Sequence, residues 1–184
     1  MPDVNLISFN GPHDNYRVVR MEAPLDGTGF DDTVKCSTGL TGFKAQFGVV
    51  KGGREDALDV NNRCQELDLA ADLWVLRGTM GFTIKGGSRD VRVSGPVEGH
   101  GRECDVDLGN ASDQSHEETR RVRLNLWRVD GSPIRVRVLN AELPFEEAGS
   151  GPYVYVFPWK SRVLRVVTVK VFMEWRRLMR RFSR

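Results

Sequence analysis

The chain has 184 residues, of which 40% are hydrophobic and 28% charged, so it can form one domain with a buried core and is not a miniprotein held together by disulfides. Its formal net charge of +2 conceals an uneven distribution, because Lys160 to Arg184 contain nine basic side chains and one acidic side chain. This segment therefore carries +8 and residues 1–159 carry −6, an asymmetry that affects attraction to partners more than the net charge does.

The cysteines and the N-terminal residues argue against export. Cys36, Cys64 and Cys104 form no Cys-x-x-Cys pair and leave an odd thiol, so a secreted disulfide framework is not expected. Residues 1–14 have neither a basic start nor an apolar core, and the most apolar stretch, residues 163–173, is far shorter than the ~20 residues that cross a bilayer. We expect reduced thiols, synthesis in the cytoplasm without a signal peptide, and no transmembrane helix.

The start of the chain, residues 1–33, contains two clusters of turn-forming residues. These lie at Asn10–Pro12 and at Asp26–Gly29. Glycine, proline, asparagine and aspartate grouped in this way are typical of turns and loops. We therefore expect an irregular or extended lead-in over residues 1–33.

Apolar pairs recur at a constant spacing of 24 after the lead-in. Each pair alternates with other residues as a strand with one buried face requires. The pairs are Val34 and Cys36, Leu58 and Val60, Phe82 and Ile84, and Val106 and Leu108. Turn-forming residues follow each pair at similar positions: Thr38-Gly39, Asn61-Asn62, Gly86-Gly87 and Gly109-Asn110. A fixed period of this length indicates a repeat architecture.

Two further ladders run at the same spacing. One comprises Phe43 and Ala45, Leu67 and Leu69, and Val91 and Val93; a weaker one comprises Val49, Leu73 and Val97. Three short strands per repeat predict a triangular coil, and hence a short parallel β-helix domain over residues 34–145, with about four and a half coils from Val34 to Leu139. A β-sandwich is the alternative, since it also has many short strands, although it does not require a strict period.

The register breaks near the end of this segment. Residues 111–119 are polar and are expected to form an insertion loop, after which strands resume at Val122–Trp127 and Ile134–Leu139. The run Glu146–Pro152 contains glycine and proline, so we expect a linker over residues 146–160.

Residues 161–184 show a helical period instead. Six side chains at alternating steps of four and three form one stripe of a helix: Leu164, Thr168, Val171, Trp175, Leu178 and Phe182. Arginines occupy the other faces: Arg176, Arg177, Arg180, Arg181 and Arg184. The sequence predicts a basic amphipathic helical tail, although residues 163–171 are rich in β-branched side chains and could form a strand.

Four roles for this tail remain open. It could cap the end of the solenoid, lie in the interface of an anionic membrane, bind nucleic acid, or dock on a protein, including a second and third copy in a homotrimer. The side chains expected to anchor it or to bind the partner are Trp175, Leu178 and Phe182 together with Arg176, Arg177, Arg180, Arg181 and Arg184.

Three segments of the repeat resemble a known superfamily. Glu55–Asn62, Ile84–Gly95 and Gly99–Gly101 are similar to segments of right-handed parallel β-helix proteins of the pectin-lyase-like superfamily. That group includes polysaccharide lyases, polygalacturonases, phage tailspikes and other virion proteins. The resemblance covers roughly residues 34–139 and consists mostly of the repeat pattern; it implies a short virion-type member with a right-handed β-helix.

The resemblance also suggests catalytic candidates. Polygalacturonases carry paired aspartates and a Gly-His-Gly histidine, and here His100 lies in Gly-His-Gly while Asp56, Asp59 and Asp107 offer carboxylates. One carboxylic acid would protonate the leaving oxygen and a carboxylate would activate water. The Asn-Thr-Asp and Arg-x-Lys segments of those enzymes are missing, however. The structural interpretation places Asp56 and Asp59 at a coil corner, His100 in a turn, and Asp107 on a solvated acidic face with Asp105.

The expected function is that of a structural virion protein, such as a phage spike, fibre or capsid-associated component, anchored by its basic tail to other virion proteins. The alternatives are a glycan-cleaving β-helix enzyme and a membrane- or nucleic-acid-binding module. A glycan or receptor is a further candidate partner. We expect no cofactor and no metal site, because the histidines and cysteines are too scattered for a zinc pattern.

Overall fold

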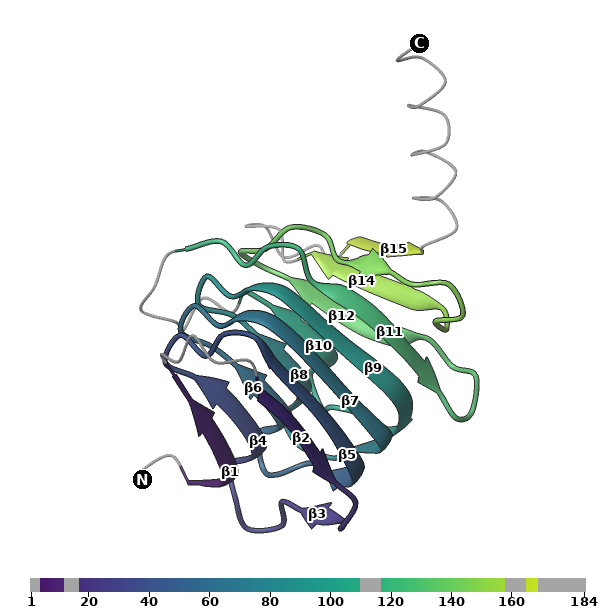
Figure 1. Ribbon diagram of the computed structural model, residues 1–184. Coiled ribbons are helices and arrows are strands. Elements are labelled where there is room, and N and C mark those ends of the chain that lie inside the picture. Colours follow the sequence, from purple (N-terminus) through teal and green to yellow (C-terminus); the bar gives the residue numbers. More distant parts are fainter. Residues whose placement is uncertain (1–3, 12–16, 110–116, 158–164, 169–184) are drawn as a thin grey trace.

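The chain folds as an all-β solenoid of about five turns. The computed structural model describes residues 4–11, 17–109, 117–157 and 165–168. The chain passes alternately between two sheets, which enclose the core between them (Figure 1). Within the described residues, no helix has the length and apolar character needed to cross a membrane.

Sheet A contains the shorter strands. Its neighbouring strands are parallel, except that the last strand runs antiparallel to the one before it. In spatial order the strands are β1 (Asn5–Asn10), β4 (Asp32–Ser37), β6 (Asp56–Val60), β8 (Met80–Ile84), β10 (Cys104–Leu108), β12 (Ile134–Val138), β14 (Tyr153–Phe157) and β15 (Arg165–Thr168).

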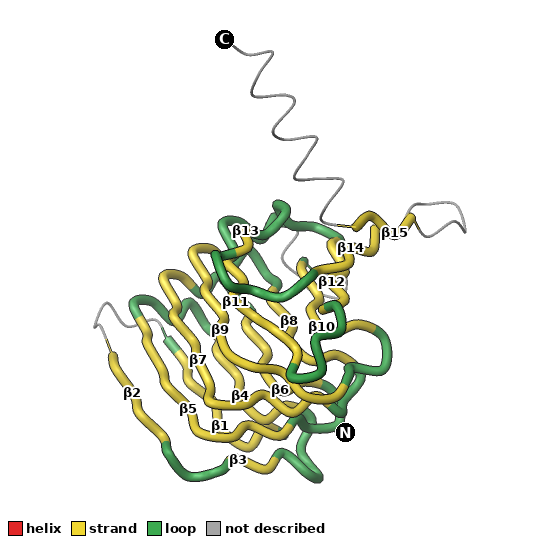
Figure 2. Tube along the Cα trace, turned by 90° about the vertical axis from the view of Figure 1, so that its right-hand side faces the viewer, coloured by secondary structure: helices red, strands yellow, loops and turns green. Residues whose placement is uncertain are grey.

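Sheet B contains longer strands, all parallel, and successive strands lie side by side along the solenoid (Figure 2). In spatial order they are β13 (Phe145–Glu146), β11 (Arg123–Arg128), β9 (Arg89–Gly99), β7 (Gln65–Leu76), β5 (Phe43–Lys51) and β2 (Arg17–Met21). The short strand β3 (Leu25–Asp26) pairs with the end of β5.

The repeat predicted from the sequence is confirmed by the strand register. Val34 pairs with Leu58, Leu58 with Phe82, and Phe82 with Val106, and all four side chains are fully buried. The parallel pairing of these strands supports the solenoid and excludes the β-sandwich, whose neighbouring strands are mostly antiparallel.

The predicted triangular coil is wrong, because each coil has two sheets instead of three. The third ladder lies in the second halves of the long strands β5, β7 and β9. Its buried members are Val50, Trp74 and Val97, so two of the three residues predicted for this layer are displaced by one position. A register shift between Ala70 and Trp74 accounts for this change, since it places Trp74 rather than Leu73 opposite Val97.

The solenoid extends beyond residues 34–145 on both sides. The expected lead-in contains β1 and β2, which pair in parallel with β4 and β5, and the expected linker contains β14, which pairs in parallel with β12. These outer coils differ in length from the 24-residue repeat. Ile7 pairs with Val34, which is 27 residues later, and Val136 pairs with Tyr155, which is 19 residues later. A search for a fixed spacing therefore misses them.

The two irregular segments are only partly described. Of the expected insertion loop at 111–119, the described part is residues 117–119, and Thr119 forms a bridge with Ala141 in the next coil. In the expected tail, Arg165–Thr168 form β15, the strand alternative that the β-branched residues favoured. The tail residues predicted to bind a partner (Trp175, Arg176, Arg177, Leu178, Arg180, Arg181, Phe182 and Arg184) lie outside the described residues.

One corner of the coil is built from residues with a left-handed backbone. Gly42, Glu66, Asp90 and Arg121 precede or begin successive strands of sheet B, and their φ angles are 64°, 54°, 57° and 53°. A glycine adopts this conformation without penalty, whereas residues with a Cβ lose about 1–2 kcal/mol. Three coils therefore keep side chains at a position where the backbone favours glycine.

Glu66→Gly is expected to stabilise the protein by about 1 kcal/mol, because it relieves the left-handed strain at a position that Gly42 fills in the preceding coil. The free energy of unfolding in urea measures this. Glu66→Ala is the matched control, since it removes the same carboxylate but keeps the Cβ. An equal gain from both variants would assign the effect to the side chain and contradict the backbone explanation.

Candidate functional site

The predicted catalytic carboxylates Asp59 and Asp107 lie in one row on sheet A. The strand register aligns Lys35, Asp59, Thr83, Asp107 and Arg137 across five successive strands. These positions alternate with the core ladder, so their side chains lie on the face turned away from the core. We call this row, with Asp105 and Arg135, the charged face of sheet A.

Asp59 is buried among cations. Its side chain is 3% exposed, and its carboxylate lies 3.3 Å from Lys35 Nζ and 3.5 Å from Lys85 Nζ. Asn61 Nδ2 donates a hydrogen bond of 2.8 Å to the same carboxylate. These partners surround the carboxylate and leave little access for a substrate.

Asp56 has the opposite electrostatic environment. It is buried, and its Oδ1 accepts no hydrogen bond from any described residue. Burial, reinforced by the neighbouring carboxylates of Asp59 and Asp32, raises the pKa of Asp56 well above its usual range. A raised pKa suits a general acid, but this carboxyl is only 3% exposed and cannot easily meet a leaving group.

Asp105 and Asp107 are not solvated, contrary to the prediction. Both are fully buried and ion-paired. Asp105 lies 2.6 Å from Arg128 and 3.1 Å from Arg135, and Asp107 lies 2.7 Å from Arg137. Burial opposes ionisation of Asp105, but hydrogen bonds from Arg135 and the ion pair with Arg128 overcome it and lower the pKa of this carboxyl.

His100 is separated from the predicted aspartate pair. Its side chain is 53% exposed, and Nδ1 lies 3.7 Å from Asp105 Oδ1. Among the described residues, no contact joins His100 to Asp56, Asp59 or Asp107. Asp59 and Asp107 are themselves two strands apart, a separation of about 9–10 Å. The structure therefore places these candidates in one region without assembling them into an acid–base pair around a shared cleft.

The sequence reasoning missed the arginines that neutralise this face. Arg135 and Arg137 lie on β12 beside Asp105 and Asp107 on β10, so an Arg-x-Arg segment faces an Asp-x-Asp segment. This complementary spacing was a usable signal. It was hidden because the paired residues of these strands are separated by 30 in sequence instead of 24.

The described residues offer no group of three histidine, cysteine or acidic side chains suited to a metal ion. Cys36, Cys64 and Cys104 are buried free thiols. Burial raises the pKa of Cys64 and of Cys104 to about 12. The thiol form dominates at neutral pH, so neither cysteine is suited to nucleophilic catalysis.

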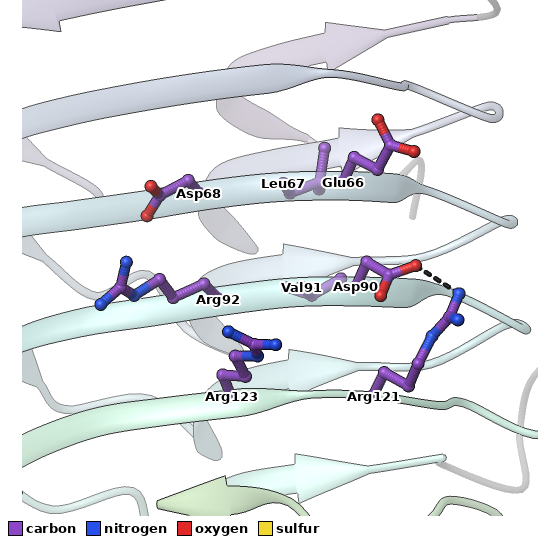
Figure 3. Close-up of a pocket in the computed structure, with 8 residues that line it drawn as sticks. All are labelled: Glu66, Leu67, Asp68, Asp90, Val91, Arg92, Arg121 and Arg123. Carbon is purple, nitrogen blue, oxygen red and sulfur yellow. Dashed lines mark hydrogen bonds and ion pairs between the residues drawn. The ribbon is translucent and has the colours of Figure 1, made fainter. Parts of the chain in front are cut away.

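A shallow groove on the outer face of sheet B is lined mainly by charged side chains (Figure 3). We call it the sheet B groove; it has a volume of about 490 Å³ and crosses β7, β9 and the start of β11. Leu67 and Val91 lie in its floor but are buried. The charged side chains that line it are Glu66, Asp68, Asp90, Arg92, Arg121 and Arg123.

The charges of the sheet B groove are only partly paired. Arg121 forms an ion pair with Asp90, and Arg92 with Glu147. Arg123 has no ion-pair partner among the described residues, and Figure 3 shows its guanidinium pointing from its own strand toward β9, the strand of Asp90 and Arg92. The groove thus offers both a hydrogen-bond donor fork and carboxylate acceptors to a polar ligand.

An exposed aromatic ring lies on the same strand as Arg123. Trp127 is 39% exposed, and Arg123 and Trp127 are both exposed while the residues Leu124 and Leu126 between them are buried. The alternation places Arg123 and Trp127 on one face, about 13 Å apart along the strand. A flat ring beside charged hydrogen-bonding groups is suited to contact with a sugar or with a protein surface.

The comparison with known proteins supplies no family. The sequence matches no known family of proteins and no curated protein, and the fold matches no solved structure. The function must therefore be inferred from the chemistry of these two faces.

Proposed function

We propose that the protein is a structural component of a virus particle: a phage spike, fibre or capsid-associated piece whose β-solenoid is displayed as a rigid body. A right-handed winding, as in the pectin-lyase-like superfamily that the repeat resembles, is part of this proposal. The basic C-terminal segment, with +8 in Lys160 to Arg184, would attach the solenoid to other virion proteins.

The observation that carries the structural role is the neutralisation of the buried carboxylates on the charged face of sheet A. Asp59 is held by two lysines, and Asp105 and Asp107 by arginines. A hydrolase needs one carboxyl that gives up a proton and another that activates water, both within reach of the substrate. Carboxylates fixed in buried ion pairs instead link neighbouring coils, because each pair connects different strands or turns.

The first coil supports an assembly role. Among the described residues, β1 and β2 each pair with a strand on one side only. Such strands present unpaired backbone groups, which can accept a strand of another chain. Val18 on β2 is 71% exposed, which adds an apolar contact to this edge.

We expect the full-length protein to co-sediment with purified virus particles in a density gradient. A variant lacking residues 169–184 keeps β15 and should remain folded by circular dichroism, but it should be lost from the particles because six of its basic side chains are missing. Incorporation of this variant at the full level would contradict the anchoring role. Absence of the full-length protein from particles would contradict the proposal as a whole.

A glycan-cleaving enzyme is the alternative, since the sheet B groove and Trp127 could contact sugars. Polygalacturonate or a capsular glycan incubated with the protein should yield no new reducing ends and no unsaturated product. Turnover that disappears in His100→Ala would favour the enzyme. The further alternative, a membrane- or nucleic-acid-binding module, depends on tail residues outside the described ones; binding to anionic vesicles and to DNA across a salt series would separate these partners.

A further inference from the structure

A second hollow lies at the corner where the chain passes from sheet B to sheet A. Its volume is about 540 Å³. Three arginines from successive coils, Arg54, Arg77 and Arg102, line it together with small residues: Thr28, Gly29, Gly52 and Gly53. No carboxylate is among the described residues that line this arginine corner.

The backbone beneath these arginines is held in place. Arg54 N donates to Phe30 O at 2.8 Å, Thr79 N to Arg54 O at 3.0 Å, and Arg102 N to Gly78 O at 3.0 Å. A Cβ on Gly53 or Gly78 would collide with a backbone oxygen of the adjacent coil. The coils therefore stack closely here, and strand spacing places successive arginines about 5 Å apart along the solenoid.

Two of the arginines are oriented by acids at the edge of the hollow. Arg54 lies 2.6 Å from Asp31 Oδ1. Arg77 pairs with Asp26 and donates hydrogen bonds to Thr28 Oγ1 and Gly52 O, both at 2.7 Å. These contacts use some of the guanidinium donors and fix the remaining ones in position.

Arg102 is different, because no described carboxylate pairs with it. Its Nη2 donates to Thr79 Oγ1 at 3.0 Å and to Arg54 O at 3.3 Å, so its position is defined while its charge is not neutralised. Residues 1–159 carry a net charge of −6, so the positive charge at the arginine corner is a local feature of a segment that is acidic as a whole.

We propose that the arginine corner is a binding site for a phosphate or sulfate group. Guanidinium groups bind tetrahedral oxyanions through paired N–H donors. Arg102 provides a positive charge that no described carboxylate neutralises, and Arg54 and Arg77 add N–H donors held in place by Asp31 and Asp26. The hollow is larger than one such group requires, so the ligand is an organic phosphate or sulfate ester whose remainder also fits within about 540 Å³.

Titration of the full-length protein with pyrophosphate and, separately, with sulfate tests this site. The readout is the shift of the Gly29, Gly52 and Gly53 backbone amides in nitrogen–proton NMR spectra, because these residues line the corner. We expect saturable shifts with at least one anion, and a comparison of the two affinities tells a phosphate ester from a sulfate ester. Acetate, a carboxylate, should bind more weakly.

Arg102→Gln should weaken binding about tenfold, which corresponds to one lost charge-assisted hydrogen bond. Arg63→Gln is the control, since Arg63 is also exposed but pairs with Glu117 at another turn. Both variants keep the same basic C-terminal segment, so its contribution cancels. Arg102→Lys preserves the charge without the paired donors and should have intermediate affinity.

Two results would overturn the proposal. The first is the absence of saturable shifts at the three glycines with pyrophosphate and with sulfate. The second is an equal loss of affinity in Arg102→Gln and Arg63→Gln, which would show that the anions respond to overall charge and not to this corner.

Discussion

Asp105→Asn is expected to lower the free energy of unfolding by about 3–5 kcal/mol at neutral pH. The carboxylate is fully buried, and the side chain of Arg128, which lies 2.6 Å away, is 1% exposed. Asparagine can still accept the hydrogen bond from the Arg135 backbone, but it cannot balance the buried guanidinium. The variant thus retains the shape of the site and loses the charge that makes burial of Arg128 tolerable.

This loss should depend on pH. Hydrogen bonds from Arg135 and the ion pair with Arg128 overcome the effect of burial and lower the pKa of Asp105 in the folded protein. A lowered pKa contributes stability above the unfolded-state value of about 3.9, and that contribution disappears as the pH falls through the folded pKa. The difference in the free energy of unfolding between wild type and Asp105→Asn, measured in urea, should therefore be largest near pH 7 and should become smaller below about pH 4.

Asp56→Asn is the informative comparison, because it should have the opposite sign. Burial and two neighbouring carboxylates raise the pKa of Asp56, so its ionised form destabilises the folded state once the pH exceeds the unfolded value. The amide removes that penalty and should raise the free energy of unfolding at neutral pH. Equal destabilisation by both variants would show that the two carboxyls do not differ in ionisation as the contacts indicate.

The sequence could predict the solenoid because stacked coils repeat the same inward positions. Val34, Leu58, Phe82 and Val106 are all buried in one ladder, and a fixed spacing identifies such a ladder without any knowledge of the turns. The first and last coils could not be found in this way, since their turns differ in length. Their strands still pair in register because the backbone hydrogen bonds, and not the turn lengths, align them.

The candidate sites were harder to predict, since they depend on which coils lie next to each other. Asp107 was recognised as a residue facing away from the core, but its burial depends on Arg137, which a longer coil brings beside it. The arginine corner has a similar origin. Arg77 and Arg102 are separated by 25 in sequence, so a strict alignment at a spacing of 24 does not bring them together.

Trp74→Ala is expected to destabilise the protein by about 3–5 kcal/mol. Trp74 is fully buried and is among the largest core side chains. Its ring packs edge-on against Phe47 and Phe82, with centroid distances of 6.1 and 5.2 Å, and its Nε1 donates a hydrogen bond of 2.9 Å to Ser94 O. Alanine would leave a cavity between the two sheets and remove the indole donor from this carbonyl.

The position of Trp74 in a middle coil should also change how the protein unfolds. Coils of a solenoid contact only their neighbours, so a weakened middle coil reduces the coupling between the two ends. Urea unfolding followed by circular dichroism should show a midpoint at lower urea concentration. The free energy of unfolding should also fall less steeply with urea concentration, because the two ends begin to unfold separately. Trp127→Ala, which removes a partly exposed ring, should change stability by less than about 1 kcal/mol. If both variants unfolded at the same urea concentration, the aromatic layer at Trp74 would not couple the coils.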